Sequence, residues 1–305
     1  MPLLGLGTWK SAPGEVGEAV STALALGYRH FDCAAIYGNE GEIGVALRRA
    51  MDEGVVSRDD LWITSKLWCN RHREEEVELG IRASIEALGV EYLDLYLVHW
   101  PVAVPFDVVG PKAPEEFLSL EEVPLEETWA GMTAALELGL TRHIGVSNYN
   151  LERVRTHARF ACPAEVNQVE LHPYLQQRSL VEGARERGVL STAYAPLGSM
   201  DRPETMKGED EPPLLEDTVV RAIAAELGAS PAQVLIAWAL QRGTAVIPKS
   251  VHPGRMAENL AAANLSLTDV QMERLATLDR PFRYVTGTFW ERAGGPYPAS
   301  ELWGE

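Results

Sequence analysis

Lysine, cysteine and long apolar runs are all scarce in this sequence of 305 residues. Only 27 Lys and Arg stand against 44 Asp and Glu, and the net charge of −17 argues against a general affinity for nucleic acid or anionic lipid. No apolar stretch reaches the ~18 residues that a membrane-spanning helix needs, and residues 1–3 do not begin a basic leader. We therefore expect a soluble, cytoplasmic protein that binds neither membranes nor nucleic acid. Any anionic ligand must bind at a local basic site.

The three cysteines, Cys33, Cys69 and Cys162, form no short metal-binding pair such as Cys-x-x-Cys. Because their number is odd, they cannot all be joined in disulfides within the chain. Isolated thiols in a reducing compartment are the favoured interpretation, and we expect no metal site.

Short β-rich segments alternate with segments of helical periodicity along the whole chain, without a low-complexity linker. Strands are predicted at residues 3–7, 28–32, 61–66, 93–99, 143–146, 165–169, 190–194 and 245–247. Helices are predicted at residues 14–26, 40–51, 73–88, 125–138, 151–158, 179–187, 215–227, 231–241, 253–263 and 268–278. This order predicts an α/β fold, a closed (β/α)8 TIM barrel in one domain over residues 1–305, with an extra helix before the last strand.

Three segments lack periodicity and are too long for ordinary connections, namely residues 101–124, 198–213 and 279–305. The first two follow the predicted fourth and seventh strands, so in a barrel they lie at the carboxyl ends of the strands, where active sites of this fold sit. The third is rich in aromatic residues, which is atypical of disorder. We expect all three segments to cover the active rim.

Polar and aromatic residues follow the predicted strands at their carboxyl ends, whereas strand interiors such as residues 95–98 are largely apolar. The residues at these ends are Thr8, Trp9, Asp32, Lys66, His99, Trp100, Ser147, Asn148, Gln168, Tyr194, Lys249 and Ser250. Three of the five lysines, Lys10, Lys66 and Lys249, lie at or near these ends. Because the pKa of an ammonium can shift whereas guanidinium stays protonated, the pattern indicates chemical roles for these lysines.

Asp32, Tyr37, Lys66 and His99 form a set with a definite chemical use. A phenol is a weak acid near neutral pH, but a neighbouring ammonium stabilises the phenolate and lowers the pKa of the phenol. Lys66 is predicted to supply this charge and Asp32 to hold it, while a neutral His99 donates a hydrogen bond to a substrate oxygen. Each residue alone has an ordinary structural explanation, such as an ion pair of Asp32 with Lys66. Only their joint placement on one rim favours a proton donor to a carbonyl oxygen.

Eight motifs, in order along nearly the whole chain, resemble the aldo-keto reductases, specifically the aldose and aldehyde reductase branch. They are LGLGTW from Leu4, DCAAIYGNEGEIGVAL from Asp32, SKLW from Ser65, LVHWP from Leu97, IGVSNY from Ile144, VNQVELHPY from Val166, AYAPLGS from Ala193 and IPKSVHPGRMAEN from Ile247. The resemblance implies an NADPH-dependent carbonyl reductase that turns an aldehyde or ketone into an alcohol by hydride transfer. It makes Tyr37 the general acid, Lys66 and Asp32 its tuning pair and His99 the orienting donor.

The resemblance also implies a set of cofactor-binding residues. In it, Tyr194 lies under the nicotinamide ring, and Ser147, Asn148 and Gln168 hold the carboxamide. The implied set is Gly7, Thr8, Trp9, Asp32, Ser147, Asn148, Gln168, Tyr194, Pro196, Leu197, Gly198, Ser199, Asp201, Lys249, Ser250, Val251, Arg255, Glu258 and Asn259. The loop at residues 198–213 resembles the family's loop over the pyrophosphate, where Asp201 would pair with Lys10 or Lys249 as a latch.

A local basic site is predicted after the last strand. Pro253 is typical of the first residue of a helix, and Arg255 falls in the first turn, near the positive end of the helix dipole. The cations of Lys249 and Arg255, with the hydroxyl of Ser250, favour a 2′-phosphorylated cofactor. We therefore expect NADPH to be preferred over NADH.

The substrate pocket is expected to be apolar and suited to a small aromatic or medium-chain aldehyde. Its expected lining is Trp9, Tyr37, Trp68, His99, Trp100 and Trp290. We expect the protein to act as a monomer.

The sequence disfavours two other enzyme classes. The segment GLGTWK from Gly5 lacks the third glycine of G-x-G-x-x-G, which disfavours a Rossmann dehydrogenase, and a G-x-S-x-G hydrolase motif is missing. A barrel that binds NADPH as a redox-sensing or structural subunit, without significant turnover, stays open. Consumption of NADPH with an aromatic aldehyde separates this alternative from a reductase.

Overall fold

A computed structural model describes residues 1–208 and 210–304, and in this part of the chain eight parallel strands follow one another in sequence order. They are β1 (Leu6–Gly7), β2 (His30–Asp32), β3 (Trp62–Leu67), β4 (Leu93–Val98), β5 (Thr141–Ser147), β6 (Val166–Glu170), β7 (Leu190–Tyr194) and β8 (Ala245–Val246). The last strand closes on the start of the chain, because Gly5 N donates to Val246 O at 2.9 Å and Val246 N to Leu3 O at 2.7 Å. The predicted closed α/β barrel is confirmed.

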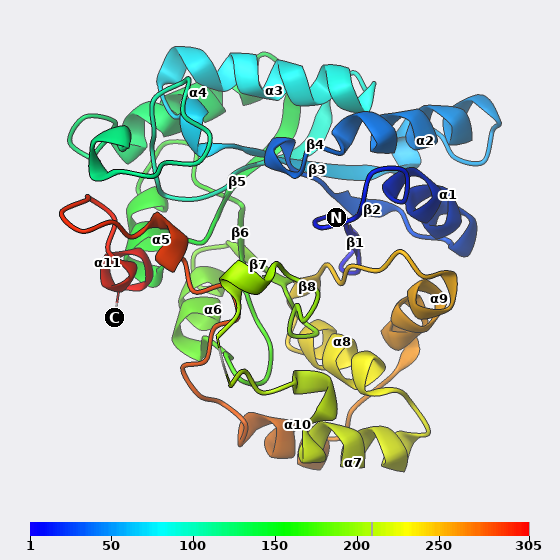
Figure 1. The fold of residues 1–305 in the computed structure, drawn as a ribbon. Helices are drawn as coiled ribbons and strands as arrows, with labels where there is room; N and C mark the ends of the chain where they lie inside the picture. Colours follow the sequence, from blue (N-terminus) through cyan, green and yellow to red (C-terminus); the bar gives the residue numbers. More distant parts are fainter. Residues whose placement is uncertain (209, 305) are drawn as a thin grey trace.

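Helices surround this sheet on the outside (Figure 1). They are α1 (Val16–Leu26), α2 (Glu40–Asp52), α3 (Glu74–Leu88), α4 (Leu125–Glu137), α5 (Leu151–His157), α6 (Arg178–Arg185), α7 (Thr218–Leu227), α8 (Pro231–Gln241), α9 (Pro253–Ala261), α10 (Asp269–Ala276) and α11 (Ala299–Trp303). Both α7 and α8 precede β8, which confirms the predicted extra helix. The short α11 lies in the segment at residues 279–305, for which no helix was predicted.

Local sequence explains where the inserted helices begin. The side chain of Asp217 accepts hydrogen bonds from the first amides of α7, and Ser230 forms a capping box with Gln233 at the start of α8. Pro231 occupies the first turn of α8, where a missing amide hydrogen does no harm. These signals set the two boundaries close to the predicted ones.

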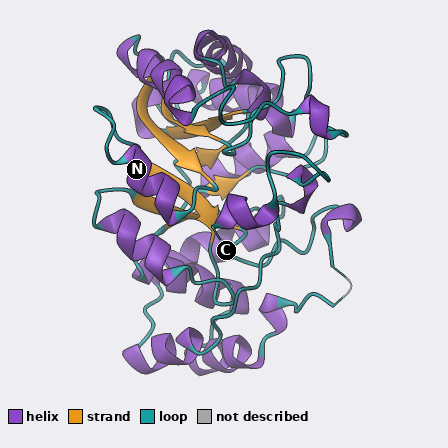
Figure 2. Cartoon of the chain, turned by 90° about the vertical axis from the view of Figure 1, so that its left-hand side faces the viewer, coloured by secondary structure: helices purple, strands orange, loops and turns teal. Residues whose placement is uncertain are grey.

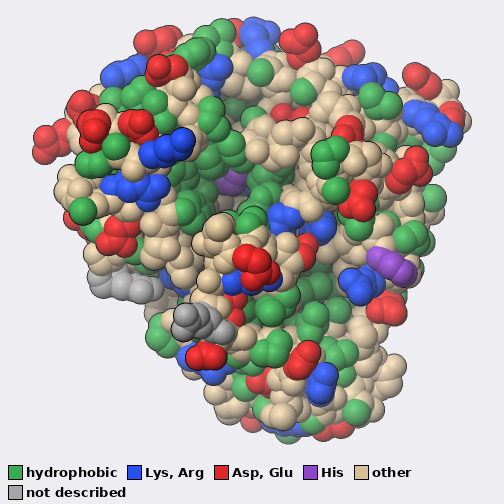
Figure 3. All heavy atoms as spheres, viewed as in Figure 1, with side chains coloured by type: hydrophobic (Ala, Val, Ile, Leu, Met, Phe, Trp, Pro, Cys, Tyr) green, Lys and Arg blue, Asp and Glu red, His purple; other side chains and the backbone are tan. Residues whose placement is uncertain are grey.

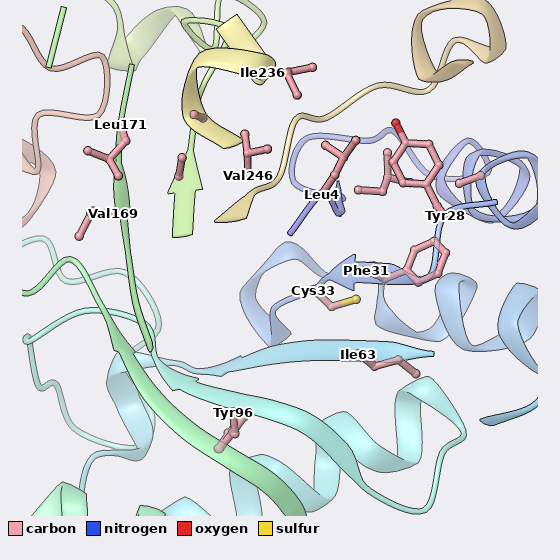
Figure 4. Packing of buried hydrophobic residues seen from close by; sticks show 14 of the residues in the cluster. Leu4, Tyr28, Phe31, Cys33, Ile63, Tyr96, Val169, Leu171, Ile236 and Val246 are labelled. Carbon is pink, nitrogen blue, oxygen red and sulfur yellow. The ribbon is translucent and has the colours of Figure 1, made fainter. Parts of the chain in front are cut away.

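The main core lies between the barrel and the helices. Phe31 of β2 is in register with Ile63 of β3, and both are buried in the same cluster as Ile43 of α2. Figure 4 shows Phe31, Ile63 and Val246 on three strands, with helices around them. Side chains alternate along a strand, so the neighbours of these apolar residues point into the barrel. Asp32, next to Phe31, is one of them.

The barrel interior is tightly packed below the site. Gly145 of β5 faces Leu97 and Val166, and a Cβ atom on Gly145 would come within 2.8 Å of the Leu97 side chain. Leu95, Leu97 and Val166 form a separate apolar cluster inside the barrel. Because the interior is filled with side chains, a ligand can enter only from the carboxyl ends of the strands. Figure 1 looks onto these ends, and Figure 2 shows the strand arrows pointing the same way in side view.

The C-terminal tail, residues 279–304 as described, packs across this rim. Trp290, Tyr297 and Leu302 of the tail are buried together with Trp100 and with Phe117 of the loop at residues 101–124. Among the described residues, no single helix is both long and apolar enough to cross a membrane, and α7 and α8 meet that criterion only as a pair bent by 92°.

Candidate active site

A cavity of about 870 Å³ opens at the carboxyl ends of the strands. Tyr37, His99 and Trp68 line one part of it, and Lys249 and Arg255 line another. Figure 3, drawn in the same view as Figure 1, shows a depression in this face where hydrophobic side chains gather. The volume lies in the range of about 300–1,000 Å³ that is usual for sites of small molecules and cofactors.

Lys66 is the centre of the polar cluster at the floor of the cavity. Its side chain is 0% exposed, and its Nζ donates to Asp32 Oδ2 at 2.6 Å, to Cys33 O at 2.9 Å and to the Tyr37 hydroxyl at 3.2 Å. The second oxygen of Asp32 accepts a bond of 2.7 Å from Gln168 Nε2. A buried ammonium is stable only when it is paired and hydrogen-bonded in this way. The cluster therefore holds Lys66 in one orientation beneath Tyr37.

Tyr37 reaches the cavity from the short helical turn η1 (Ala35–Tyr37), which follows β2. The chain leaves this turn through Gly38 at φ 68°, a left-handed conformation that favours glycine. Because the three hydrogens of Lys66 Nζ serve three acceptors, the Tyr37 oxygen is an acceptor in this contact. Its own proton points elsewhere, and Tyr37 lines the cavity.

The predicted lowering of the Tyr37 pKa is wrong. Burial raises the pKa of Tyr37 to about 12, and this effect outweighs the lowering by the Lys66 ammonium. For Lys66, burial lowers the pKa, but Asp32 and Tyr37 raise it above its ordinary value. The sequence indicated the contact correctly, but it carries no measure of how completely the phenol is removed from water.

His99 stands beside Tyr37 at the edge of this cluster. Its ring lies edge-on to Tyr37 at 5.8 Å and to Trp68 at 5.2 Å, measured between ring centroids. Burial lowers the pKa of His99 well below its ordinary value, and Lys66 lowers it further. The ring is therefore neutral at pH 7, as predicted, with one nitrogen able to donate and the other to accept.

Ser147, Asn148, Gln168 and Tyr194 meet on the wall next to the cluster. The Tyr194 hydroxyl donates to Asn148 Oδ1 at 2.8 Å, and Ser147 Oγ donates to Gln168 O at 2.8 Å. Asn148 Nδ2 donates to His99 O at 2.9 Å, which joins this wall to the catalytic candidates. All four residues line the cavity and combine an aromatic face with amide and hydroxyl groups.

The basic end of the cavity lies between the strand ends and α9. Asp201, in the loop at residues 198–213, bridges two lysines, at 2.5 Å from Lys10 Nζ and 3.2 Å from Lys249 Nζ. The predicted ion pair is thus formed with both candidates at once. Arg255 lines the cavity from the first turn of α9 and has no ion pair with any residue in the described ranges.

Comparison with known proteins adds independent evidence. The model of the "Aldo/keto reductase family" matches residues 3–280. The chain belongs to the aldo/keto reductase family. It is 53% identical over 306 residues to the aldo/keto reductase slr0942 of Synechocystis sp., covering 100% of this chain and 94% of that protein. Over 289 residues it is 45% identical to aldo-keto reductase family 1 member A1 of Homo sapiens and 44% identical to that of Gallus gallus, covering 93% of this chain and 88% of each relative.

Membership makes this aldo/keto reductase an oxidoreductase that acts on carbonyl groups, in a family whose enzymes use nicotinamide cofactors. Within the described ranges, no group of three His, Cys, Asp or Glu residues is placed to hold a metal ion.

The structure brings most of the expected site residues to the cavity lining; Lys66 lies behind Tyr37, and two further residues lie outside the lining. Trp290 does not line the cavity. It is buried behind Trp68 and Trp100, with centroid distances of 5.5 Å and 6.0 Å, and its neighbour Phe289 lines the cavity instead. Gly198 also lies outside the lining and sits against the Tyr284 ring. In a tight turn adjacent residues point to different sides, and no sequence period reveals which one faces a ligand.

Several lining residues were missed by the sequence reasoning. They are Ile36, Ala195, Met200, Met206, Leu215, Ser230, Pro231, Ala232, Ile247, Pro248, His252, Val285 and Phe289. The capping signal at Ser230 placed the start of α8 correctly but did not show that this start faces the cavity. Only the packing of α8 beside α9 brings it there.

Proposed function

We propose that this chain is an NADPH-dependent reductase of aldehydes and ketones in which Tyr37 is the general acid. One observation carries the proposal: the hydroxyl of Tyr37 lies on the cavity and accepts a hydrogen bond from the buried Lys66 at 3.2 Å. This contact leaves the phenol proton free to reach a carbonyl oxygen.

Tyr37, Lys66 and His99 have different roles in the proposed proton transfer. The high pKa of Tyr37, about 12, keeps the phenol protonated until an alkoxide, a stronger base, forms beside it. After transfer, the phenolate is stabilised by the ammonium of Lys66, which Asp32 holds at 2.6 Å. Neutral His99 donates a second hydrogen bond to the same substrate oxygen. NADPH, when bound, supplies the hydride for the carbonyl carbon.

The cavity fits such a cofactor. Tyr194 offers a ring face for the nicotinamide, and Ser147, Asn148 and Gln168 offer polar groups for its carboxamide. At the other end, Lys249, Ser250 and Arg255 would hold the 2′-phosphate, while Glu258 and Asn259 would contact the adenosine. Arg255, which forms no ion pair within the described residues, lies beside the N-terminus of α9. Such a cation favours a phosphate, so NADPH is preferred over NADH.

The substrate is an uncharged aromatic or medium-chain aldehyde. Trp9, Trp68, Trp100 and Phe289 line the part of the cavity near Tyr37 with aromatic surface. Among the described lining residues, the charged ones apart from Asp32 lie at the cofactor end, so these residues offer a charged substrate no partner for its charge. All the proposed groups come from one chain, which we propose to act as a single-domain monomer in the cytoplasm.

The test is the loss of NADPH absorbance with benzaldehyde, a straight-chain aldehyde, a ketone and a sugar. Turnover with NADPH that exceeds turnover with NADH supports the proposal. Binding of NADPH without consumption across this panel would contradict it and favour the redox-sensing or structural subunit.

A further inference from the structure

We propose that Glu170 is a positioning residue that holds the C-terminal tail over the substrate end and, through Tyr284, supports the loop at residues 198–213. The inference rests on the proposed function, because it concerns the walls of the same cavity. Glu170 itself does not line that cavity.

Glu170 ends β6, and its side chain is 0% exposed. Its Oε1 accepts from Tyr284 N at 2.6 Å and from His172 Nε2 at 2.8 Å, and its Oε2 accepts from Val285 N at 2.8 Å. A carboxylate can serve this many donors, and burial makes each bond costly to lose. Through Glu170, β6 thus binds the backbone of the tail at two successive residues, Tyr284 and Val285.

The two residues bound by Glu170 adjoin the part of the tail that lines the substrate end of the cavity. Val285 lines the cavity, and Phe289, four residues further on, lines it as well. Trp290 then packs against Trp68, which is itself part of the cavity wall. A displaced tail would therefore alter the aromatic wall around the substrate. Asp32, Tyr37, Lys66 and His99 lie outside the tail and would keep their contacts.

Tyr284 also contacts the loop at residues 198–213, which lies at the cofactor end of the cavity. Its hydroxyl donates to Pro212 O at 2.6 Å, and its ring lies 5.3 Å from the guanidinium of Arg202. The Arg202 side chain is buried within the loop, where it pairs with Glu211 and donates to Ser199 O at 3.2 Å. This is the loop whose Asp201 bridges Lys10 and Lys249. Tyr284 thus packs against the loop on the side away from the cavity and does not line the cavity itself.

The far end of the tail has its own attachment. Arg153 of α5 donates through Nη1 to Leu302 O at 2.7 Å, near the end of α11. The intervening segment, which carries Phe289, is therefore held at both ends. Loss of the hydrogen bonds to Glu170 should shift the tail near Tyr284 and Val285 and leave α11 attached.

The main experiment compares Glu170→Gln with Glu165→Gln. Glu165 precedes the other end of β6 and pairs with His143 at a half-exposed position, so it is a matched control. Glutamine offers one acceptor oxygen where the carboxylate offers two, and its NH2 group faces other donors. We expect Glu170→Gln to raise the KM for benzaldehyde about tenfold, with an unchanged kcat and an unchanged KM for acetaldehyde. Glu165→Gln should change none of these constants.

A second variant separates the effect of Glu170 on the tail from its effect, through Tyr284, on the loop at residues 198–213. Tyr284→Phe removes the hydroxyl that bonds to the backbone at Pro212 and Leu214 and leaves the bond from Tyr284 N to Glu170 in place. We therefore expect faster NADP+ dissociation, measured by stopped-flow fluorescence, with an unchanged KM for benzaldehyde. Glu170→Gln should speed dissociation as well. If Glu170→Gln lowers only the melting temperature and leaves both KM values and the dissociation rate unchanged, the role is merely structural and the proposal is wrong.

A readout without turnover keeps this inference separate from the proposed function. Near-UV circular dichroism reports the packing of Trp68, Trp100 and Trp290, and limited proteolysis reports release of the tail. A wild type that reduces no aldehyde contradicts the proposed function alone, whereas unchanged spectra and cleavage in Glu170→Gln contradict the positioning role. Should Glu170→Gln fail to fold, Glu170→Asp, which withdraws the carboxylate by one methylene, is judged by the same measurements.

Discussion

The ammonium of Lys66 donates a hydrogen bond of 3.2 Å to the phenol oxygen of Tyr37, and only the phenol reaches the cavity. In the proposed reaction, Lys66 would therefore act on a substrate through Tyr37 and not by direct contact. This division explains why the phenol can stay protonated at rest and yet yield a stabilised phenolate.

Tyr37→Phe tests the proton donor directly. We expect aldehyde reduction to fall by about 100- to 10,000-fold, the usual contribution of a general acid. NADPH affinity, measured by fluorescence titration, should stay unchanged because the ring remains in place. Turnover near the wild-type level in this variant would exclude Tyr37 as the donor.

Lys66→Met tests the buried ion pair. Asp32 would keep a buried negative charge with Gln168 as its remaining side-chain donor. Removing one partner of such a pair typically costs about 3–5 kcal/mol of unfolding free energy, which urea denaturation measures. Lys112→Met, at an exposed lysine, is the control and should change stability little. Equal stability of both variants would show that Asp32 is relieved in another way.

Lys249→Ala combined with Arg255→Ala tests the phosphate site. The double variant should bind NADPH more weakly and bind NADH almost as before, because only NADPH carries the 2′-phosphate. Arg155→Ala, on the exposed side of α5, serves as a control for charge alone. An equal loss of affinity for the two cofactors would remove the argument for this site.

The pH dependence of stability should reflect buried histidines. Burial lowers the pKa of His157 to about 4, and the ring lies among aromatic side chains, 4.5 Å from Trp129 between centroids. In the unfolded chain a histidine titrates near a pKa of about 6.5, so the unfolded state binds the proton first. The stabilising contribution is complete above that pH and is lost as the pH falls toward 4.

His157→Phe checks this assignment. The variant should show a flatter decline of unfolding free energy between about pH 6.5 and 4, since it lacks the proton uptake of the unfolded state. His252→Phe, at an exposed histidine, should decline like the wild type. An identical slope in His157→Phe and the wild type would assign the acid sensitivity to other groups.

Most of the barrel was predictable because strands and helices leave different periods of apolar residues in a sequence. The catalytic candidates were predictable for a related reason: in a parallel barrel the carboxyl end of every strand opens on one face. By that rule, the sequence alone predicts that Asp32, Lys66 and His99 lie in one place. Residues outside regular strands follow no such rule, so Phe289 and the start of α8 were missed.

The sequence by itself determined the order of strands and helices and the residue types at the active rim, since both are local properties of the chain. The tertiary structure alone decided that burial raises the pKa of Tyr37 more than Lys66 lowers it. It also decided that Phe289 and not Trp290 faces the cavity, and that the single carboxylate of Asp201 pairs with two lysines. These properties depend on distances and on exclusion of water between segments far apart in the chain. Glu170 belongs to the same group, because its role arises from where the tail passes over the barrel.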